Sequence, residues 1–170
     1  MFQSKPCSIA NFIFSPPQGI RLDDLSGDKH YSVWERYGSS KLANILFSNE
    51  LNRRMQDENA PVISVALHPG VITGTNLKRH SNNVSHMASL VGSFNGFSAM
   101  SAMLQDGGKT IPQGAATTVL CALSPDVQPG GYYMDCAPST LLHAKATDVK
   151  LAQDLWEISE KLTSAAPSQT

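Results

Sequence analysis

Residues 36–51 read RYGSSKLANILFSNEL and give the clearest structural signal in the chain. The stretch contains no proline, and from Ser39 and Ser40 onward it is rich in residues that favour helices. At ~100° per residue, such a helix would carry polar side chains on one narrow face and apolar side chains over most of the rest. The polar strip comprises Tyr37, Lys41, Asn44 and Ser48, and the apolar part comprises Leu42, Ala43, Ile45, Leu46, Phe47 and Leu51. The pattern predicts a largely buried helix with a thin polar strip.

Tyr37 and Lys41 could act together on that strip. An isolated tyrosine has a pKa near ~10 and exchanges protons poorly at neutral pH. A nearby ammonium group favours the phenolate and lowers the pKa of the phenol. Lys41 follows Tyr37 by about one helical turn, so both side chains leave the same face and could serve as a general acid/base for an alcohol or carbonyl oxygen. Many ordinary helices carry a tyrosine and a lysine at this spacing, so the pair alone leaves both interpretations open.

The wider segment Tyr-x-x-Ser-Lys-Leu-Ala-Asn, at residues 37–44, resembles the catalytic helix of the short-chain dehydrogenases/reductases. It is most similar to the branch that contains retinol dehydrogenases and WW-domain-containing oxidoreductases, and the similarity continues through residues 45–51. The resemblance implies that Tyr37 transfers a proton, and that Lys41 lowers the pKa of Tyr37 and holds the nicotinamide ribose. Both residues would then contact an NAD or NADP cofactor. It also implies that a serine upstream orients the substrate oxygen.

Ser8 takes the place of that serine. The resembled branch has a loop between its catalytic serine and its catalytic tyrosine, and here proline and glycine at residues 16–19 predict a turn. Residues 1–35 as a whole are expected to be irregular. The family has a strongly apolar strand before its serines, which residues 3–6 do not provide, so an ordinary loop serine remains the alternative for Ser8.

Residues 62–67 read VISVAL, a nearly continuous apolar run that predicts a parallel strand covered on both faces. A helix, a short loop and a buried strand in succession are typical of a doubly wound sheet, so the expected fold class is α/β. His-Pro-Gly follows at residues 68–70, at the carboxyl end of the strand, where such sheets bind ligands. Proline and glycine also make ordinary turns. The resemblance implies that this turn shapes the nicotinamide pocket through Pro69, Gly70, Ile72 and Thr75, with Thr73 as the alternative to Thr75.

Residues 81–111 are rich in Ser, Asn, Gly and Met, and the corresponding region of the resembled family closes over the substrate. Apolar side chains there could line an adaptable pocket or simply pack in the core. Proline near its start predicts a helix at residues 112–123, followed by a turn and short strand at 130–135. An amphipathic helix anchored by Trp156 is expected at 148–162, and residues 163–170 are expected to be disordered.

The composition is that of an ordinary globular protein, because 41% of the 170 residues are hydrophobic and 16% are charged. A net charge of −1 gives no electrostatic case for a nucleic acid or an anionic membrane as partner. The 3 cysteines and 5 histidines lack metal-ligand spacing, so no metal site is expected. No apolar run approaches the ~20 residues of a membrane span and no signal peptide is evident, so the cytoplasm is the expected compartment.

The resemblance covers most of this chain but only the later part of the family's fold. A dinucleotide-binding half needs successive βαβ units of ~30 residues or more, opened by a glycine-rich turn. Only 36 residues precede Tyr37, and they contain no such turn. The expected fold is therefore a partial Rossmann-like, doubly wound parallel sheet that lacks the N-terminal nucleotide-binding half. It would form a single truncated domain at residues 1–162, with residues 1–18 poorly matched.

Two functions fit these observations. The first is an NAD(P)-dependent oxidoreductase of the short-chain dehydrogenase/reductase type that acts on a small lipophilic alcohol or carbonyl compound, with Tyr37 and Lys41 as the acid/base pair. The residues that select NAD or NADP would belong to the absent half. The second is a non-catalytic fragment that serves as an interaction module, for example as a homodimer through the helix of Tyr37.

Overall fold

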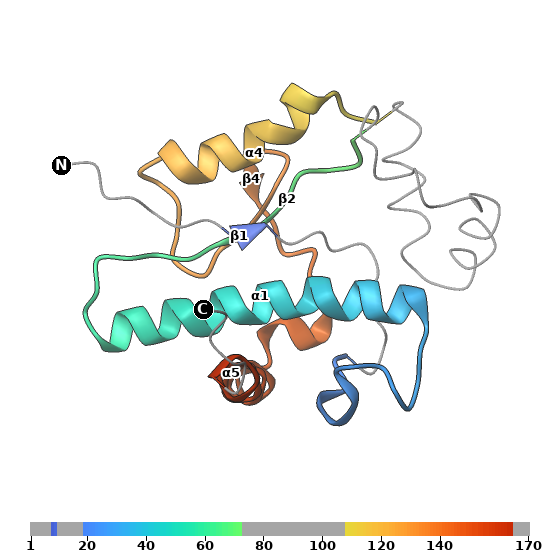
Figure 1. Ribbon diagram of the computed structural model, residues 1–170. Coiled ribbons are helices and arrows are strands. Elements are labelled where there is room, and N and C mark those ends of the chain that lie inside the picture. The colour runs from blue at the N-terminus through green and yellow to red at the C-terminus, as the bar shows by residue number, and fades with distance from the viewer. Residues whose placement is uncertain (1–7, 10–18, 73–107, 165–170) are drawn as a thin grey trace, which may run out of the picture.

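The computed structural model describes residues 8–9, 19–72 and 108–164 (Figure 1). These residues form a small sheet with helices on both of its faces. The helices and strands, in chain order, are β1 (Ser8–Ile9), η1 (Leu22–Asp24), α1 (Val33–Asp57), β2 (Ala66–His68), α4 (Ile111–Leu123), β3 (Tyr132–Met134), β4 (Ala137–Pro138), η3 (Ala144–Thr147) and α5 (Val149–Ser164).

The sheet has the strand order β1-β2-β3-β4. β1, β2 and β3 are parallel, with Ser8 opposite Ala66 and His68 opposite Met134, and β4 is antiparallel to β3. The strand predicted at residues 62–67 is present, but its regular pairing is confined to Ala66–His68. Ser64 and Val65 before it are already buried, and the Gly130 N–H donates to the Ser64 carbonyl oxygen at 2.9 Å. The backbone therefore enters the sheet before the regular strand begins.

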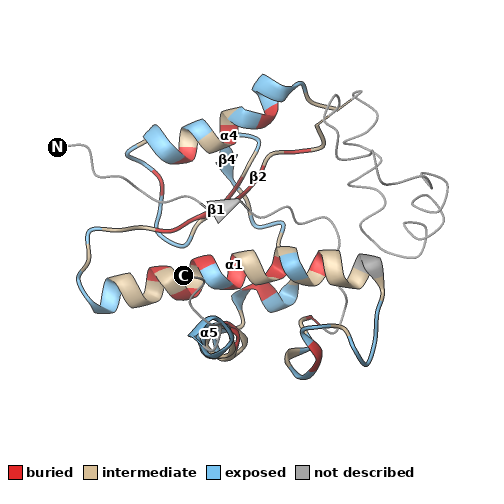
Figure 2. Cartoon of the chain, in the orientation of Figure 1, coloured by how far each residue is buried: buried red, intermediate tan, exposed pale blue. Residues whose placement is uncertain are grey.

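Alternating side chains along β2 and β3 build two apolar clusters on opposite faces of the sheet. Ala66 and Tyr132 pack with α1, η3 and α5 on one face, whereas Leu67 and Tyr133 pack with α4 on the other. In Figure 2 the buried residues accordingly follow β2 and recur along α1. This three-layer arrangement confirms the predicted α/β class and its partial Rossmann-like parallel sheet.

The predicted buried helix is α1, with Leu42, Ile45 and Leu46 at most 1% exposed. Two of its side chains differ from the expectation. Ser48, assigned to the polar strip, is fully buried and shares a hydrogen bond of 2.8 Å with Ser64 on the segment before β2. Phe47, assigned to the buried part, is 47% exposed. Helical periodicity alone does not say which neighbour will cover each face of a helix.

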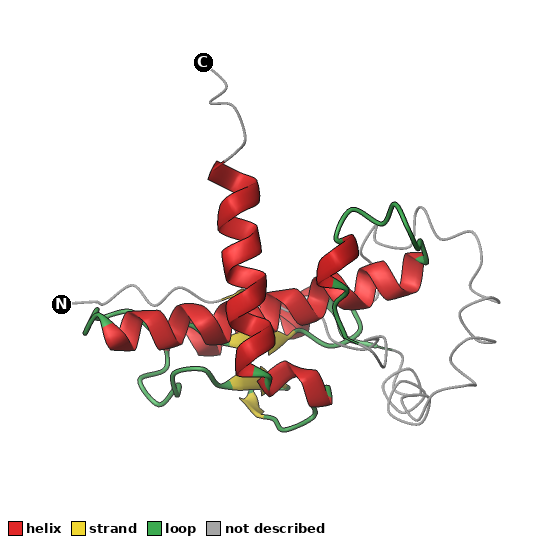
Figure 3. Cartoon of the chain, turned by 90° about the horizontal axis from the view of Figure 1, so that it is seen from below, coloured by secondary structure: helices red, strands yellow, loops and turns green. Residues whose placement is uncertain are grey.

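α5 packs across α1 on the side away from the sheet (Figure 3). Trp156 stacks on Phe47 with ring centroids 5.2 Å apart, and the Arg54 guanidinium lies 4.6 Å from the Trp156 ring. Trp156 thus anchors α5, as predicted. The helix extends to Ser164, past the expected end at residue 162, so the first residues of the predicted disordered tail are helical.

α4 begins at a capping box between Thr110 and Gln113 and has proline in its first turn, in agreement with the predicted helix. Among the helices that the structure describes, none combines the length and the apolar character needed to cross a membrane.

Candidate active site

Tyr37 and Lys41 lie in the N-terminal half of α1, and both side chains are partly buried. The Lys41 ammonium lies over the Tyr37 ring, with Nζ 5.3 Å from the ring centroid. This is within the distance at which a cation and an aromatic ring attract each other. The two side chains therefore share one face of α1, as their spacing predicted.

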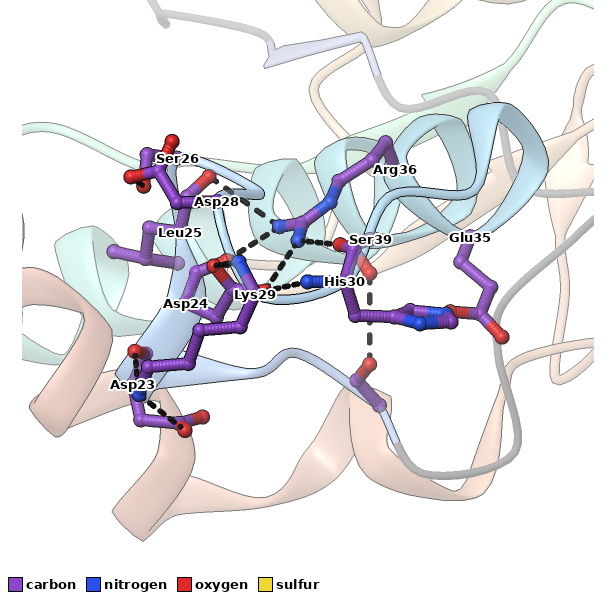
Figure 4. Close-up of polar contacts among 11 residues, drawn as sticks. Asp23, Asp24, Leu25, Ser26, Asp28, Lys29, His30, Glu35, Arg36 and Ser39 are labelled. Carbon is purple, nitrogen blue, oxygen red and sulfur yellow. Dashed lines mark hydrogen bonds and ion pairs between the residues drawn. The ribbon is translucent and has the colours of Figure 1, made fainter.

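A polar cluster that the sequence did not reveal fixes the segment before α1 (Figure 4). The Asp24 side chain is only 3% exposed, and its carboxylate accepts from Arg36 Nη2 at 2.8 Å. Arg36 Nη1 donates to the Asp24 carbonyl oxygen at 2.5 Å, and Arg36 Nη2 also donates to the His30 carbonyl oxygen. The Arg36 guanidinium thus joins the turn at residues 24–30 to the helical turn that carries Tyr37.

Backbone groups complete this cluster. The Lys29 and His30 N–H groups donate to the Asp24 carboxylate at 3.1 and 3.0 Å. Burial by itself would raise the pKa of Asp24, but these two N–H groups and Arg36 outweigh it and lower the pKa to about 2. The carboxylate is therefore charged at neutral pH. Ser39 on α1 adds a long contact of 3.5 Å to the Gly19 carbonyl oxygen.

The turn at residues 69–72 follows the carboxyl end of β2. Gly70 has a φ of +85°, a backbone conformation that favours glycine, and the end of the Lys109 side chain lies 2.7 Å from where a Cβ would be. The Gly70 N–H donates to Nδ1 of His68 at 2.9 Å. Ile72 packs over Gly114 on α4, where a Cβ would lie 2.3 Å from the Ile72 Cδ1 atom. Two glycines thus allow this turn to lie against its neighbours.

Lys109 fastens the turn to the rest of the sheet. Its N–H donates to the Val71 carbonyl oxygen at 2.8 Å, and its backbone bridges in parallel with Ile72. Its ammonium group forms an ion pair with Asp135 in the turn between β3 and β4. The segment before α4, the turn after β2 and the β3–β4 turn are therefore joined through one residue, by its backbone on one side and its side chain on the other.

Parallel topology places the candidate residues at one end of the sheet. α1 connects the parallel strands β1 and β2 and contacts both, so its N-terminal half lies toward their carboxyl ends. In Figure 1 that half of α1 and the segment leaving β2 lie on the same side of the molecule. Ser8 is a strand residue in β1 and not the loop residue that was the alternative. The elements that carry Ser8, Tyr37, Lys41, Pro69, Gly70 and Ile72 thus converge there.

Some predicted features lie outside the described residues. They are Thr73, Thr75 and most of the segment at residues 81–111. Within residues 8–9, 19–72 and 108–164, no group of three or more His, Cys, Asp or Glu side chains could hold a metal ion.

Known proteins are similar to this chain over most of its length. No protein-family model matches the chain. It is 40% identical over 152 residues to short-chain dehydrogenase TIC 32 A, chloroplastic, of Brassica napus. The aligned region covers 88% of this chain and 43% of that protein. The chain is 41% identical over 143 residues to human retinol dehydrogenase 14, covering 83% of the chain and 39% of that protein. The WW domain-containing oxidoreductase of Danio rerio is 34% identical over 151 residues, covering 88% of the chain and 31% of the relative.

A solved structure supports the fold over a similar span. The crystal structure of an uncharacterized protein from Mycobacterium paratuberculosis superposes with a TM-score of 0.63 at 26% sequence identity. The match covers 93% of this chain and 49% of that one. The chain thus spans less than half the length of the curated relatives and of the solved structure named here.

Proposed function

Because this chain is homologous to the short-chain dehydrogenases/reductases over most of its length, we propose that it is an NAD(P)-dependent oxidoreductase for an alcohol or carbonyl compound. The observation that carries the proposal is the Tyr37–Lys41 pair, with the Lys41 Nζ 5.3 Å from the Tyr37 ring centroid on the end of α1 nearest the carboxyl ends of β1 and β2. Ligands of parallel α/β sheets bind at this end.

The chemistry follows from the two side chains. A bound nicotinamide cofactor would supply or accept the hydride. Tyr37 would donate its phenolic proton to the carbonyl oxygen in the reducing direction and take the alcohol proton in the oxidising direction. The positive charge of Lys41 stabilises the phenolate that remains after donation. Ser8 on the neighbouring strand is the proposed group that orients the substrate oxygen.

The residues after β2 are proposed to lie at the nicotinamide end of the cofactor. The glycine turn at Gly70 and the buried His68 lie at the same end of the sheet as the acid/base pair. Pro69, Gly70 and Ile72 would border the nicotinamide, with Thr75 beyond the described residues, and Lys41 would hold its ribose. No glycine-rich turn in the sequence fits the pyrophosphate, so the described residues account for one end of the dinucleotide alone.

Titration of the 170-residue chain with NADH and NADPH, followed by nucleotide fluorescence and calorimetry, tests the proposal. We expect saturable binding, followed by oxidation of the nucleotide when a lipophilic aldehyde or ketone is added. Retinal belongs in that panel because a relative is named retinol dehydrogenase. The Tyr37→Phe variant is the matched control, since it should bind the nucleotide and fail to turn it over. The absence of binding up to millimolar nucleotide would overturn the proposal and favour a non-catalytic interaction module.

A homodimer through α1 is part of the same proposal. Sedimentation equilibrium over a wide concentration range would measure it, with a Phe47→Glu variant to weaken the α1 surface and a Val119→Glu variant on α4 as control. Both side chains are about half exposed, but Phe47 also stacks on Trp156, so circular dichroism must show that both variants stay folded before they are compared. A monomer at every concentration would remove the dimer from the proposal.

A further inference from the structure

His68 is the last residue of β2, and its side chain is almost completely buried, at 1% exposure. Its Nδ1 atom accepts the Gly70 N–H at 2.9 Å, so the proton of the neutral ring lies on Nε2. Within the described residues, that Nε2 atom is buried and has no hydrogen-bond partner. Native proteins rarely leave a buried donor without a partner, so the bond that the ring does make, from the Gly70 N–H to Nδ1, is the contact that indicates a role for His68.

The Nδ1 side of the ring binds the turn at residues 69–72, whose conformation is unusual. Gly70 adopts a φ of +85°, and the Lys109 side chain fills the space that a Cβ would take. The far side of this turn is fixed to Lys109 through the Val71 carbonyl oxygen and the bridge at Ile72. The near side is fixed through the His68 Nδ1 atom. Without that acceptor the buried Gly70 N–H would lose its partner and the turn would be anchored at one end only.

The alternation of β2 places the ring on the functional side of the sheet. Ala66 belongs to the apolar cluster on the α1 face, and Leu67 to the cluster on the α4 face. Side chains two residues apart on a strand share a face, so His68 lies on the face of α1, the helix that carries Tyr37 and Lys41.

We propose that His68 is a positioning residue, whose neutral imidazole holds the turn at residues 69–72 in the conformation that faces the nicotinamide. This inference rests on the proposed oxidoreductase function for its consequence, but its physical basis, the bond from the Gly70 N–H to His68, is independent of any cofactor. His68 acts through the turn and makes no contact with the reacting atoms.

Two substitutions at His68 separate the effect of the hydrogen-bond acceptor from the effect of side-chain volume. In His68→Asn, the side-chain oxygen is as many bonds from Cα as Nδ1 and can accept from the backbone N–H two residues on. In His68→Leu, most of the volume remains and the acceptor is lost. We expect His68→Asn to keep nucleotide affinity close to that of the unchanged chain. His68→Leu should weaken the affinity roughly tenfold or more, since a buried donor is left unpaired.

Two NMR measurements test the proposal without a cofactor. In the unchanged chain, the ¹⁵N shifts of His68 should show the tautomer with the proton on Nε2, and the Gly70 amide should be protected from hydrogen exchange. That protection should persist in His68→Asn and fall at least tenfold in His68→Leu.

The outcomes distinguish this inference from the proposed function. If no nucleotide binds but Gly70 behaves as described, the oxidoreductase proposal fails and the positioning role stands. If the proton lies on Nδ1, or if His68→Asn loses Gly70 protection as fully as His68→Leu, the positioning role is wrong. The tautomer measurement needs no variant, so a proton on Nδ1 would overturn the positioning role even if His68→Leu does not fold.

Discussion

Tyr37→Phe removes a single oxygen atom, so it tests the proposed proton transfer directly. The side chain is partly buried on α1 beside Lys41, and Tyr37→Phe keeps the ring that lies under the ammonium. We expect turnover to fall on the order of 10²–10⁴-fold, the usual contribution of a general acid/base, with little change in nucleotide affinity. Steady-state kinetics and the nucleotide titration measure the two effects separately. Equal losses in affinity and turnover would contradict an acid/base role.

His68 should make the stability of the fold depend on pH between about 4 and 6.5. Burial lowers the pKa of His68 from 6.5 to about 4, against an opposing effect of the Asp135 charge that Lys109 partly offsets. The unfolded chain therefore takes up this proton near pH 6.5, whereas the folded chain takes it up only near pH 4. The free energy of unfolding should fall as the pH drops through this interval, by about 3 kcal/mol in total.

Urea unfolding between pH 7 and pH 4 checks this, with His68→Asn as the control. The pKa of His143 is also lowered, by burial and by Lys145, but His143 is present in both chains and its contribution cancels in the difference. A chain and its His68→Asn variant with the same pH dependence would show that His68 does not titrate as described.

The Asp24–Arg36 ion pair joins the η1 segment to α1. Adjacent residues offer a matched comparison, because the Asp23 side chain is 74% exposed in its pair with Lys29, whereas that of Asp24 is 3% exposed. We expect Asp24→Asn to destabilise the chain at pH 7 and to raise hydrogen exchange at residues 24–30, and Asp23→Asn to do neither, because exposed pairs contribute little.

The stability of the same two chains at acidic pH tests the charge of Asp24 directly. The pKa of Asp24 falls from 3.8 to about 2 on folding, so its stabilising effect is complete above pH 3.8 and disappears as the pH falls toward 2. The difference between Asp24→Asn and the unchanged chain should vanish over the same interval. A difference that stays constant to pH 2 would mean that the carboxylate charge does not hold the segment.

Gly114 tests the contact between α4 and the turn after β2. Glycine to alanine inside a helix usually stabilises by roughly 1 kcal/mol, but here the new Cβ would lie 2.3 Å from the Ile72 Cδ1 atom. We expect Gly114→Ala to destabilise by roughly 1–3 kcal/mol through overpacking, and Ile72→Ala to restore much of that loss in the double variant. Denaturant unfolding measures both. Ala115→Gly, at an exposed position of α4, measures the ordinary cost of glycine in this helix. If the changes in unfolding free energy at Gly114 and Ile72 simply add in the double variant, the contact between these residues is ruled out.

For the molecule as a whole, the sequence predicted the features that depend on local periodicity. The apolar residues of α1, the buried run that contains β2 and the proline at the start of α4 identify their elements without knowledge of any partner. The Asp24–Arg36 and Lys109–Asp135 pairs join residues 12 and 26 positions apart, and nothing in the local pattern indicates which carboxylate a given cation will meet. His68 was visible only as part of a turn motif, because its bond to the Gly70 N–H depends on the conformation of the turn.

The two apolar clusters lie on opposite faces of the same strands, which predicts that they unfold together. Leu46 belongs to the cluster on the α1 face and Val65 to the cluster on the α4 face, and both are at most 2% exposed. Leu46→Ala and Val65→Ala should each destabilise the chain, the former by roughly 2–5 kcal/mol. Each should shift the transition seen by tryptophan fluorescence, which reports on Trp34 and Trp156, as much as the transition seen by far-ultraviolet circular dichroism.

The reason is that β2 and β3 form the shared wall of both clusters, so loss of one face removes the backbone against which the other packs. If Val65→Ala shifted only the circular dichroism transition, α1 and α5 would be stable without the sheet.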